Sequence, residues 1–401
     1  MGRFFSNGFA FTIFATVKCM TRSALAWIGS IALLLACSSQ GWSAEVNATP
    51  IRAGQFVGSA GCKSSSCHGG AGEKRSQYQT WLQQDFHARS YAILTNARSA
   101  RIAETLQLGA AQTNARCTVC HAPFQSVAPA RLMRTAHADE GVSCESCHAA
   151  AGSWLRGHTR KDWSYATRLA AGVRDLRSFY VRANTCVACH QNLDADIKNA
   201  GHPELIFELD RQSVAEPKHW RDEPSSGPRA WLVGQAVALR EVSWRLSQDE
   251  TVNADLAAEW NALAWLLAKA TSNQSLPAID ASSLTTTPDT FKRMQSQADL
   301  LARRASERSV TSVKILQTLA ASDSEFLVSR EPLELLFRRA VRLVLALDRL
   351  SASNARETTN ADRSPELDRL FEDVRSRADF QPARFADHLA SFRATITQSP
   401  P

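Results

Sequence analysis

The sequence predicts a mainly α-helical protein with few strands, and three observations lead to this prediction. No segment of the 401-residue chain shows sustained alternation of apolar and polar residues, which is the pattern typical of a half-buried strand. From about residue 230 onward, apolar residues recur at helical spacing. Eight of the ten Cys lie between Cys62 and Cys189, and nine of the ten His lie between His68 and His219. The chain therefore divides into a first part that carries the chemistry and a second part that resembles a helical bundle.

Residues 1–44 have the features of an export signal. The basic residue Arg22 precedes an apolar run over 24–36, which matches the length of a secretory signal and is too short to span a bilayer. The run ends in Leu-Leu-Ala-Cys at Cys37, which resembles a bacterial lipobox. Lipid attachment at Cys37 and ordinary cleavage after residue 43 or 44 both remain open. We expect a periplasmic or otherwise exported protein, with membrane attachment only through a lipid at Cys37.

The other eight cysteines form four pairs, and each pair is followed directly by a histidine. The second to fourth pairs have the spacing C-x-x-C-H, which is the attachment signature of haem c. Two thiols one helical turn apart can add to the two vinyl groups of the porphyrin, and the adjoining His then binds the iron. The first pair has four intervening residues, a longer variant that the same chemistry tolerates. The four sets are Cys62, Cys67 and His68; Cys117, Cys120 and His121; Cys144, Cys147 and His148; and Cys186, Cys189 and His190.

These motifs predict four covalently attached haem c groups. Zinc is the first alternative, because C-x-x-C pairs also build zinc sites, and disulfides are the second. Neither alternative requires a His directly after every second Cys. Zinc thiolates also fit poorly with export to a compartment where free thiols oxidise.

Six histidines remain as candidates for the second axial position of each iron. We expect distal ligation from His87, His137, His158 and His202, whereas His219 is a weaker candidate. His388 lies in an apparent helix and is expected to be solvated. An iron without a second protein ligand stays open to exogenous ligands.

Five segments of the C-terminal part are expected to have defined local structure. Apolar spacing predicts helices over 231–246 and 256–267. Further helices are expected over 290–320, over 332–350 and from Ser364-Pro365 to about 377, whereas the Ser/Thr/Pro-rich stretch 271–289 is expected to be a loop. The predicted domain boundary lies at residue 229, between a haem-binding domain over 45–229 and a helical domain over 230–401.

The charge distribution argues against nucleic acid as a partner. The net charge of +7 includes three basic residues of the export segment. Residues 38–229 hold 22 basic and 17 acidic residues, and residues 230–401 hold 21 and 22. Neither part is strongly basic, so a mixed-charge solvated surface fits better than a phosphate-binding stripe.

Over roughly residues 55–205 the sequence resembles the tetrahaem cytochrome c-554 family, whose best-known member carries electrons from hydroxylamine oxidoreductase. The marks of the resemblance are the run 56–62 (Phe-Val-Gly-Ser-Ala-Gly-Cys), the run from Trp81 to His87, the run 141–148 (Gly-Val-Ser-Cys-Glu-Ser-Cys-His) and the following His158. The resemblance implies a multihaem cytochrome c domain over 45–229.

The resemblance also implies a set of ligand pairs. It implies three bis-histidine haems, with His87 serving the haem of His148, His137 that of His68, and His158 that of His190. It leaves the haem of His121 five-coordinate. The sequence departs from the family pattern in three ways: the longer first motif, the position of His137 close to the third motif, and the additional His202 and His219. His202 could be the second axial ligand of the haem on His121.

Three functions remain open at this stage. The leading hypothesis is an exported tetrahaem cytochrome that carries electrons between redox partner proteins. The second is a reductase that acts on a small nitrogen oxide or hydroxylamine at an open haem on His121. The third is a non-catalytic, haem-bearing interaction module.

Overall fold

The computed structural model describes residues 54–398, except 192, 216, 221–225, 283 and 359–363. The expected export segment and Cys37 lie outside the described residues. The protein is mainly helical, as the sequence predicts, and extended pairing within this part is limited to an isolated parallel bridge between Phe56 and Leu132. Over the same residues, no helix is long and apolar enough to cross a membrane.

Short helices separated by loops make up the described chain from residue 54 to about 220. Several of them begin at a side-chain cap; the Asn114 side chain, for example, accepts from the backbone N–H of Arg116 at 3.0 Å. The helices are α1 (Gln77–Gln84), α2 (Ser90–Ile93), α3 (Ala97–Thr105), α4 (Ala115–His121), α5 (Cys144–His148), α6 (Tyr165–Ala170), α7 (Phe179–His190), α8 (Ala195–Asn199) and α9 (Leu209–Ala215). Short 3-10 turns lie between them: η1 (Ser59–Gly61), η2 (Phe86–Arg89), η3 (Ala111–Thr113), η4 (Pro123–Ser126) and η5 (Pro129–Arg131).

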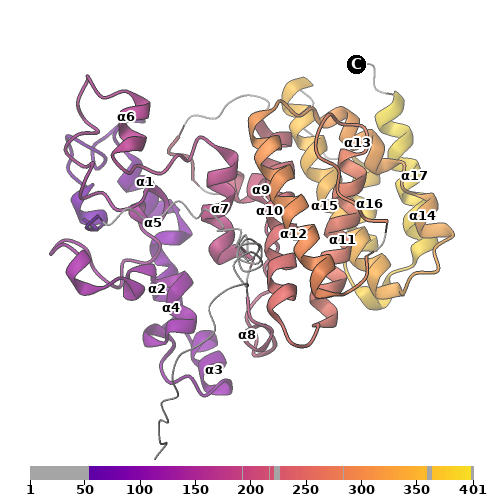
Figure 1. Cartoon of the computed structure of the whole chain (residues 1–401), viewed down its shortest axis with the longest axis horizontal. Coiled ribbons are helices and arrows are strands. Elements are labelled where there is room, and N and C mark those ends of the chain that lie inside the picture. The colour runs from indigo at the N-terminus through magenta and orange to yellow at the C-terminus, as the bar shows by residue number, and fades with distance from the viewer. Residues whose placement is uncertain are drawn as a thin grey trace, which may run out of the picture. The chain divides into compact units, whose positions relative to one another are not determined.

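Longer helices form a bundle in the C-terminal part, and Figure 1 shows α10, α11, α12 and α15 running side by side. The bundle helices are α10 (Ser226–Gln248), α11 (Ala254–Thr271), α12 (Pro288–Glu307), α13 (Ser312–Ala320), α14 (Ser324–Leu327), α15 (Leu333–Thr358), α16 (Pro365–Asp373) and α17 (Pro382–Gln398), with the 3-10 turn η6 (Arg377–Asp379) between the last two.

Several of the expected helix boundaries differ from the structure. The helix expected over 332–350 extends to Thr358, and the one expected over 256–267 extends to Thr271. The segment 290–320 holds two helices, because the backbone is extended at Arg308 and again at Thr311. The helix that begins at Pro365 ends at Asp373 rather than near 377. Its predicted N-cap is present, since the hydroxyl of Ser364 accepts from the backbone N–H of Leu367 at 3.3 Å.

The apolar core is distributed unevenly along the chain. One large cluster of buried side chains runs through the bundle and includes the fully buried Trp231, Trp260 and Phe291. Over the described residues 54–174, the buried apolar side chains form three small clusters, which are centred on Phe56 and Phe124, on Val57 and Trp154, and on Leu94 and Ala103.

Helix α7 lies where the two kinds of packing meet. Phe179, Ala183 and Val187 belong to the large cluster of the bundle, while the same helix ends in the fourth attachment motif. Phe207 and Leu209, which also precede residue 229, pack in that cluster as well. The two-domain boundary near 229 stays a prediction, and the bundle core extends to residues before it.

Candidate haem centres

Three of the four attachment motifs lie at the C-terminal ends of helices. Helices α4, α5 and α7 end in His121, His148 and His190, and each carries its two cysteines within the preceding turn. Helical geometry therefore places both thiols and the imidazole of each motif along one short stretch of helix. This is the arrangement that attachment through two vinyl groups and one axial ligand requires.

The longer first motif forms a turn rather than a helix. It follows η1, and the backbone N–H of Cys67 donates to the carbonyl of Ser64 at 2.9 Å. The N–H of His68 donates to the carbonyl of Cys62 at 3.3 Å. These bonds fold the two extra residues into the turn and bring the imidazole back beside the first cysteine.

Each of the four motif histidines faces one histidine from elsewhere in the chain. The rings of His68 and His158 are nearly parallel, at 14°, whereas those of His87 and His190 are perpendicular, at 90°. The two other pairs are inclined at 69° and 65°. The distances between ring centroids are 6.2 Å for His68 and His158, 6.1 Å for His87 and His190, 6.3 Å for His121 and His202, and 6.4 Å for His148 and His219.

These separations fit one metal ion between each pair of rings. An imidazole nitrogen binds a first-row transition metal at about 2 Å, and the ring centroid lies about 1 Å behind that nitrogen. Two imidazoles on opposite sides of one metal therefore have centroids about 6 Å apart. All four measured separations fall near this value, so the residues present fit an axially ligated iron at every motif.

The hydrogen bonds of the ring nitrogens point to the same role. In six of the eight rings, Nδ1 lies within hydrogen-bonding distance of an oxygen acceptor, which leaves Nε2 available for a metal. The acceptors are the Gln77 side chain for His68, the Asp85 carboxylate for His87, and the carbonyls of Ser90, Leu155, Pro203 and Pro217 for His121, His158, His202 and His219.

Burial favours the neutral form of three of the motif histidines by lowering their pKa. Desolvation lowers the pKa of His148 to about 4, and the neighbouring His219 adds to the effect. Burial also lowers the pKa of His121 and of His190. A neutral imidazole has a free lone pair, and that is the form in which histidine binds metals.

The four attachment sites follow one another in space in an order that differs from their order in the chain. The thiols of Cys62 and Cys144 are hydrogen-bonded, which places the first site beside the third. The thiols of Cys120 and Cys189 are also hydrogen-bonded, which places the second site beside the fourth. Cys147 acts electrostatically on Cys189, so the third site neighbours the fourth. The spatial order is therefore first, third, fourth, second.

Two loops bring His202 and His219 into position. Gly201 adopts φ +111°, a left-handed conformation that favours glycine, and its carbonyl accepts from Arg98 Nε at 3.0 Å. Two residues after His202, the Glu204 carboxylate pairs with Lys198 at 3.1 Å and with Arg338 of α15 at 3.3 Å. The His202 loop is thus held by α8 and by the bundle, whereas the ring of His219 packs edge-on against Trp220.

The ring pairs differ from those that the family resemblance implies. His87 faces His190 rather than His148, and His158 faces His68 rather than His190. His137, assigned by the resemblance to His68, is exposed, and its backbone N–H donates to the Glu140 carboxylate at 2.9 Å.

One further histidine also differs from expectation: His219, the weaker candidate, faces His148. His388 lies on α17 with its side chain 29% exposed, and its ring pairs with the buried Asp373 at 2.6 Å.

Comparison with known proteins gives one match. Residues 61–149 match the family model described as cytochrome c554 and c-prime. The resemblance to the cytochrome c-554 family is confirmed. The match supports a c-type cytochrome, a class of electron carrier with covalently bound haem c. No curated protein and no solved structure matches the chain.

Within the matched segment of this cytochrome, Glu145 joins the third motif to the residues before the first. This carboxylate is 2% exposed and accepts from the backbone N–H groups of Val57 at 2.9 Å, Gly58 at 2.7 Å and Ala151 at 2.5 Å. Burial raises the pKa of Glu145, and these three hydrogen bonds offset part of that effect. The sequence marks this residue only as a variable position of the motif, so its anchoring role is visible only in the fold.

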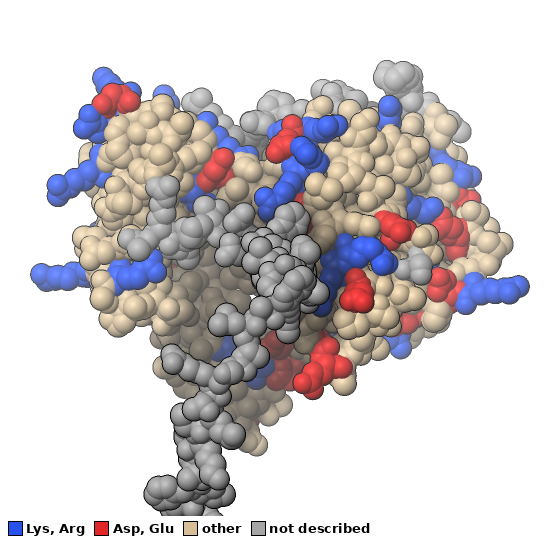
Figure 2. Space-filling view, in the orientation of Figure 1, with Lys and Arg blue, Asp and Glu red and all other residues tan. Residues whose placement is uncertain are grey.

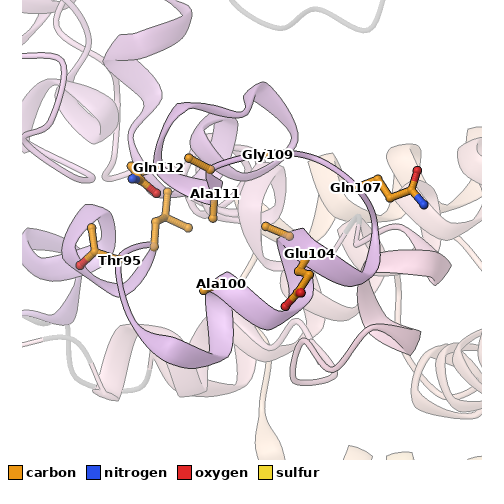
Figure 3. A pocket seen from close by; sticks show the side chains of 10 residues that line it. Thr95, Ala100, Glu104, Gln107, Gly109, Ala111 and Gln112 are labelled. Atoms are coloured by element: carbon orange, nitrogen blue, oxygen red, sulfur yellow. The ribbon is translucent and has the colours of Figure 1, made fainter.

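A cavity of about 380 Å³ lies beside the second motif of the cytochrome (Figure 3). Its wall is built by α3 and η3 and includes Leu94, Ala103 and Ala111. The same three residues form the small apolar cluster against which Cys117 packs. The cavity therefore belongs to the surroundings of the second attachment site.

Proposed function

We propose that this chain is an exported electron carrier that holds four haem c groups, each iron ligated by two histidines. The observation that carries the proposal is the set of four facing imidazole pairs at 6.1 to 6.4 Å. The proposed proximal ligands are His68, His121, His148 and His190, and the proposed distal ligands are, in the same order, His158, His202, His219 and His87. Residues 1–44 would supply the export signal.

The contribution of the chain is to fix the coordination shell. Haem c supplies one-electron redox chemistry when bound. Imidazoles on both faces of each iron, six of the eight held by Nδ1 hydrogen bonds, would keep the same ligands in both oxidation states. Little then rearranges around the metal when an electron arrives or leaves, and this favours electron transfer over the binding of a substrate.

The spatial sequence of attachment sites supports a directed path. The first and second motifs lie at the two ends of the series, and the third and fourth lie between them. Electrons would enter near one end motif and leave near the other. The proposed partners are redox proteins that dock near those ends.

Charge on the surface is consistent with protein partners rather than nucleic acid. Figure 2 shows Lys and Arg interspersed with Asp and Glu on the face in view. Such a mixed surface suits transient, salt-sensitive encounters between carriers.

The arrangement does not favour the alternative function of a reductase with an open haem on His121. That alternative needs a vacant sixth position, and the ring of His202 stands opposite His121 at 6.3 Å. The proposal therefore treats His202 as the ligand that closes the site.

The test is a haem count by mass together with absorption and EPR spectra of the ferric protein. We expect four covalent haems, low-spin ferric signals that cyanide does not change, and an absorption spectrum of the reduced protein that carbon monoxide does not change. His202→Ala should convert one haem to high spin and make it bind carbon monoxide when reduced. His137→Ala is the matched control, because that exposed ring faces no other imidazole in the described part of the chain, and its spectrum should stay unchanged. A high-spin signal in the unsubstituted protein would contradict the proposal and restore the reductase hypothesis.

A further inference from the structure

The acceptor of the His87 ring differs in kind from those of the other five hydrogen-bonded rings. Asp85 places its Oδ1 3.0 Å from Nδ1 of His87, and the same oxygen accepts from the backbone N–H of His87 at 2.9 Å. The Asp85 residue is 5% exposed. The other acceptors are the neutral side-chain amide of Gln77 and four backbone carbonyls.

A buried carboxylate on Nδ1 changes the ligand that Nε2 presents to a metal. When Nε2 binds the metal, Nδ1 carries the hydrogen and donates it to the carboxylate, which makes the imidazole a stronger electron donor. A stronger donor stabilises the ferric form over the ferrous form. The negative charge of Asp85 acts in the same direction, because the ferric centre carries one more positive charge and burial weakens the screening.

We propose that Asp85 is a positioning residue that selectively lowers the reduction potential of the haem bound at His190, acting through His87. This inference rests on the proposed ligation of one iron by His87 and His190. Because the fourth site lies inside the spatial series, the lowered potential falls at an inner position of the path rather than at either end. Asp85 would thereby make electron transfer from a neighbouring haem to this inner haem less favourable for electrons that pass between the end sites.

The decisive variant is Asp85→Asn, which keeps an oxygen acceptor for both hydrogen bonds and removes only the charge. At a fixed solution potential near the midpoint, the ratio of ferrous to ferric haem at this site should rise about tenfold, the scale on which such outer-shell partners act. For a one-electron couple this corresponds to about 59 mV. The measurement is an EPR-monitored redox titration of the complete holoprotein.

The ring angles identify which haem shifts. Perpendicular imidazoles give a strongly anisotropic low-spin signal, and parallel imidazoles give a rhombic one. The His87 and His190 rings are at 90° and the His68 and His158 rings at 14°, so the two sites have distinguishable signals. The midpoint of the most anisotropic signal should move upward in Asp85→Asn. A smaller shift is expected at the neighbouring His148 site, because the charge of Asp85 also acts on His219.

Gln77 offers the matched control on another haem. Its Oε1 lies 3.1 Å from Nδ1 of His68, and Gln77→Glu would introduce the charge that Asp85→Asn removes. The midpoint of the rhombic signal should then move downward, by less than in the first variant because Gln77 is only partly buried. Two opposite shifts on two different haems would not result from loosened packing.

The inference and the proposed function fail in different ways. If the unsubstituted protein lacks four low-spin haems, the proposed ligation is wrong. If four low-spin haems are present and Asp85→Asn moves no midpoint, or moves only the rhombic signal, Asp85 has no tuning role and the ligation stands.

Discussion

The haem-binding part and the helical bundle differ in how many apolar side chains they bury. The bundle buries large side chains such as Trp231, Trp260 and Phe291 against one another in one continuous cluster. The part that the structure describes before residue 175 has three small apolar clusters, and Leu82 and Phe86 remain 46% and 74% exposed there. A segment of this length needs more buried apolar surface than that to fold. We infer that the porphyrins predicted by the attachment motifs would supply the missing core.

One helix belongs to both kinds of core. The apolar face of α7 lies in the bundle cluster, and Tyr180 and Asn184 on the same helix join a polar network around the buried Arg240 of α10. Arg240 Nη1 also pairs with Asp299 of α12 at 2.9 Å. The bundle thus fixes the helix that carries the fourth attachment motif.

Removing the haems should distinguish the two parts most strongly. A full chain in which the eight motif cysteines are replaced by alanine should lose most amide protection in α1 to α6 and keep it in α10 to α17, because only the second set has its own core. Hydrogen exchange followed by mass spectrometry measures this directly against the holoprotein. Equal protection of both parts in the haem-free chain would show that the first part folds without porphyrin.

A smaller effect, on the free energy of unfolding, is expected when the polar network between α7 and the bundle is disrupted. Arg240→Ala leaves the carboxylates of Glu241 and Asp299 without their shared guanidinium, and such a loss costs about 3–5 kcal/mol for a buried pair. Urea denaturation of the holoprotein gives the change in free energy of unfolding. Arg303→Ala is the control, because this residue pairs with the same Asp299 at 2.8 Å but its side chain is 43% exposed, and it should cost only about 0–1 kcal/mol. Equal losses for the two variants would remove the argument that α7 is anchored through a buried charge.

The smallest effect concerns a buried acid at the start of α9. Burial, with the charge of Glu208 adding to it, raises the pKa of Asp210 from 3.8 to about 7. Between these values the folded protein binds a proton that the unfolded chain has released, so the free energy of unfolding falls as pH rises toward 7, by at most about 1.4 kcal/mol for each pH unit. Asp210→Asn should flatten this dependence when stability is measured at pH 5, 6 and 7. Identical slopes in both proteins would mean that Asp210 titrates near its usual value.

The attachment motifs can be predicted from the sequence because their residues are close together in the chain. Each C-x-x-C-H motif fits within two turns of helix, so spacing alone places both cysteines and the proximal histidine together. The bundle helices were readable for the same reason, since a period of 3.6 residues needs no knowledge of the partner. The exception was the break between α12 and α13, where two residues with extended backbone interrupt an otherwise helical pattern.

The sequence does not predict which histidine faces each motif histidine, because each pair joins segments that are distant in the chain. His137 lies close to the third motif in sequence, but its turn is tied by Glu140 and leaves the ring exposed. His219 lies in a short loop with no periodic signal, yet its ring faces His148. The loop of His202 is likewise supported by residues far away in the chain. Arg98 donates to the carbonyl of Gly201, and Arg338 pairs with Glu204.

The crossing pattern of the histidine pairs has a topological consequence. Each proposed iron joins two points that lie about 70 to 100 residues apart, and the four loops closed in this way overlap one another. Such cross-links restrict the unfolded chain as disulfides do in small secreted domains, and longer loops lose more entropy on closure. If the cysteines of this region form thioethers, as the motifs predict, the axial bonds would restrict the chain in place of disulfides. Electron transfer and the restriction of the unfolded chain would then depend on the same eight imidazoles.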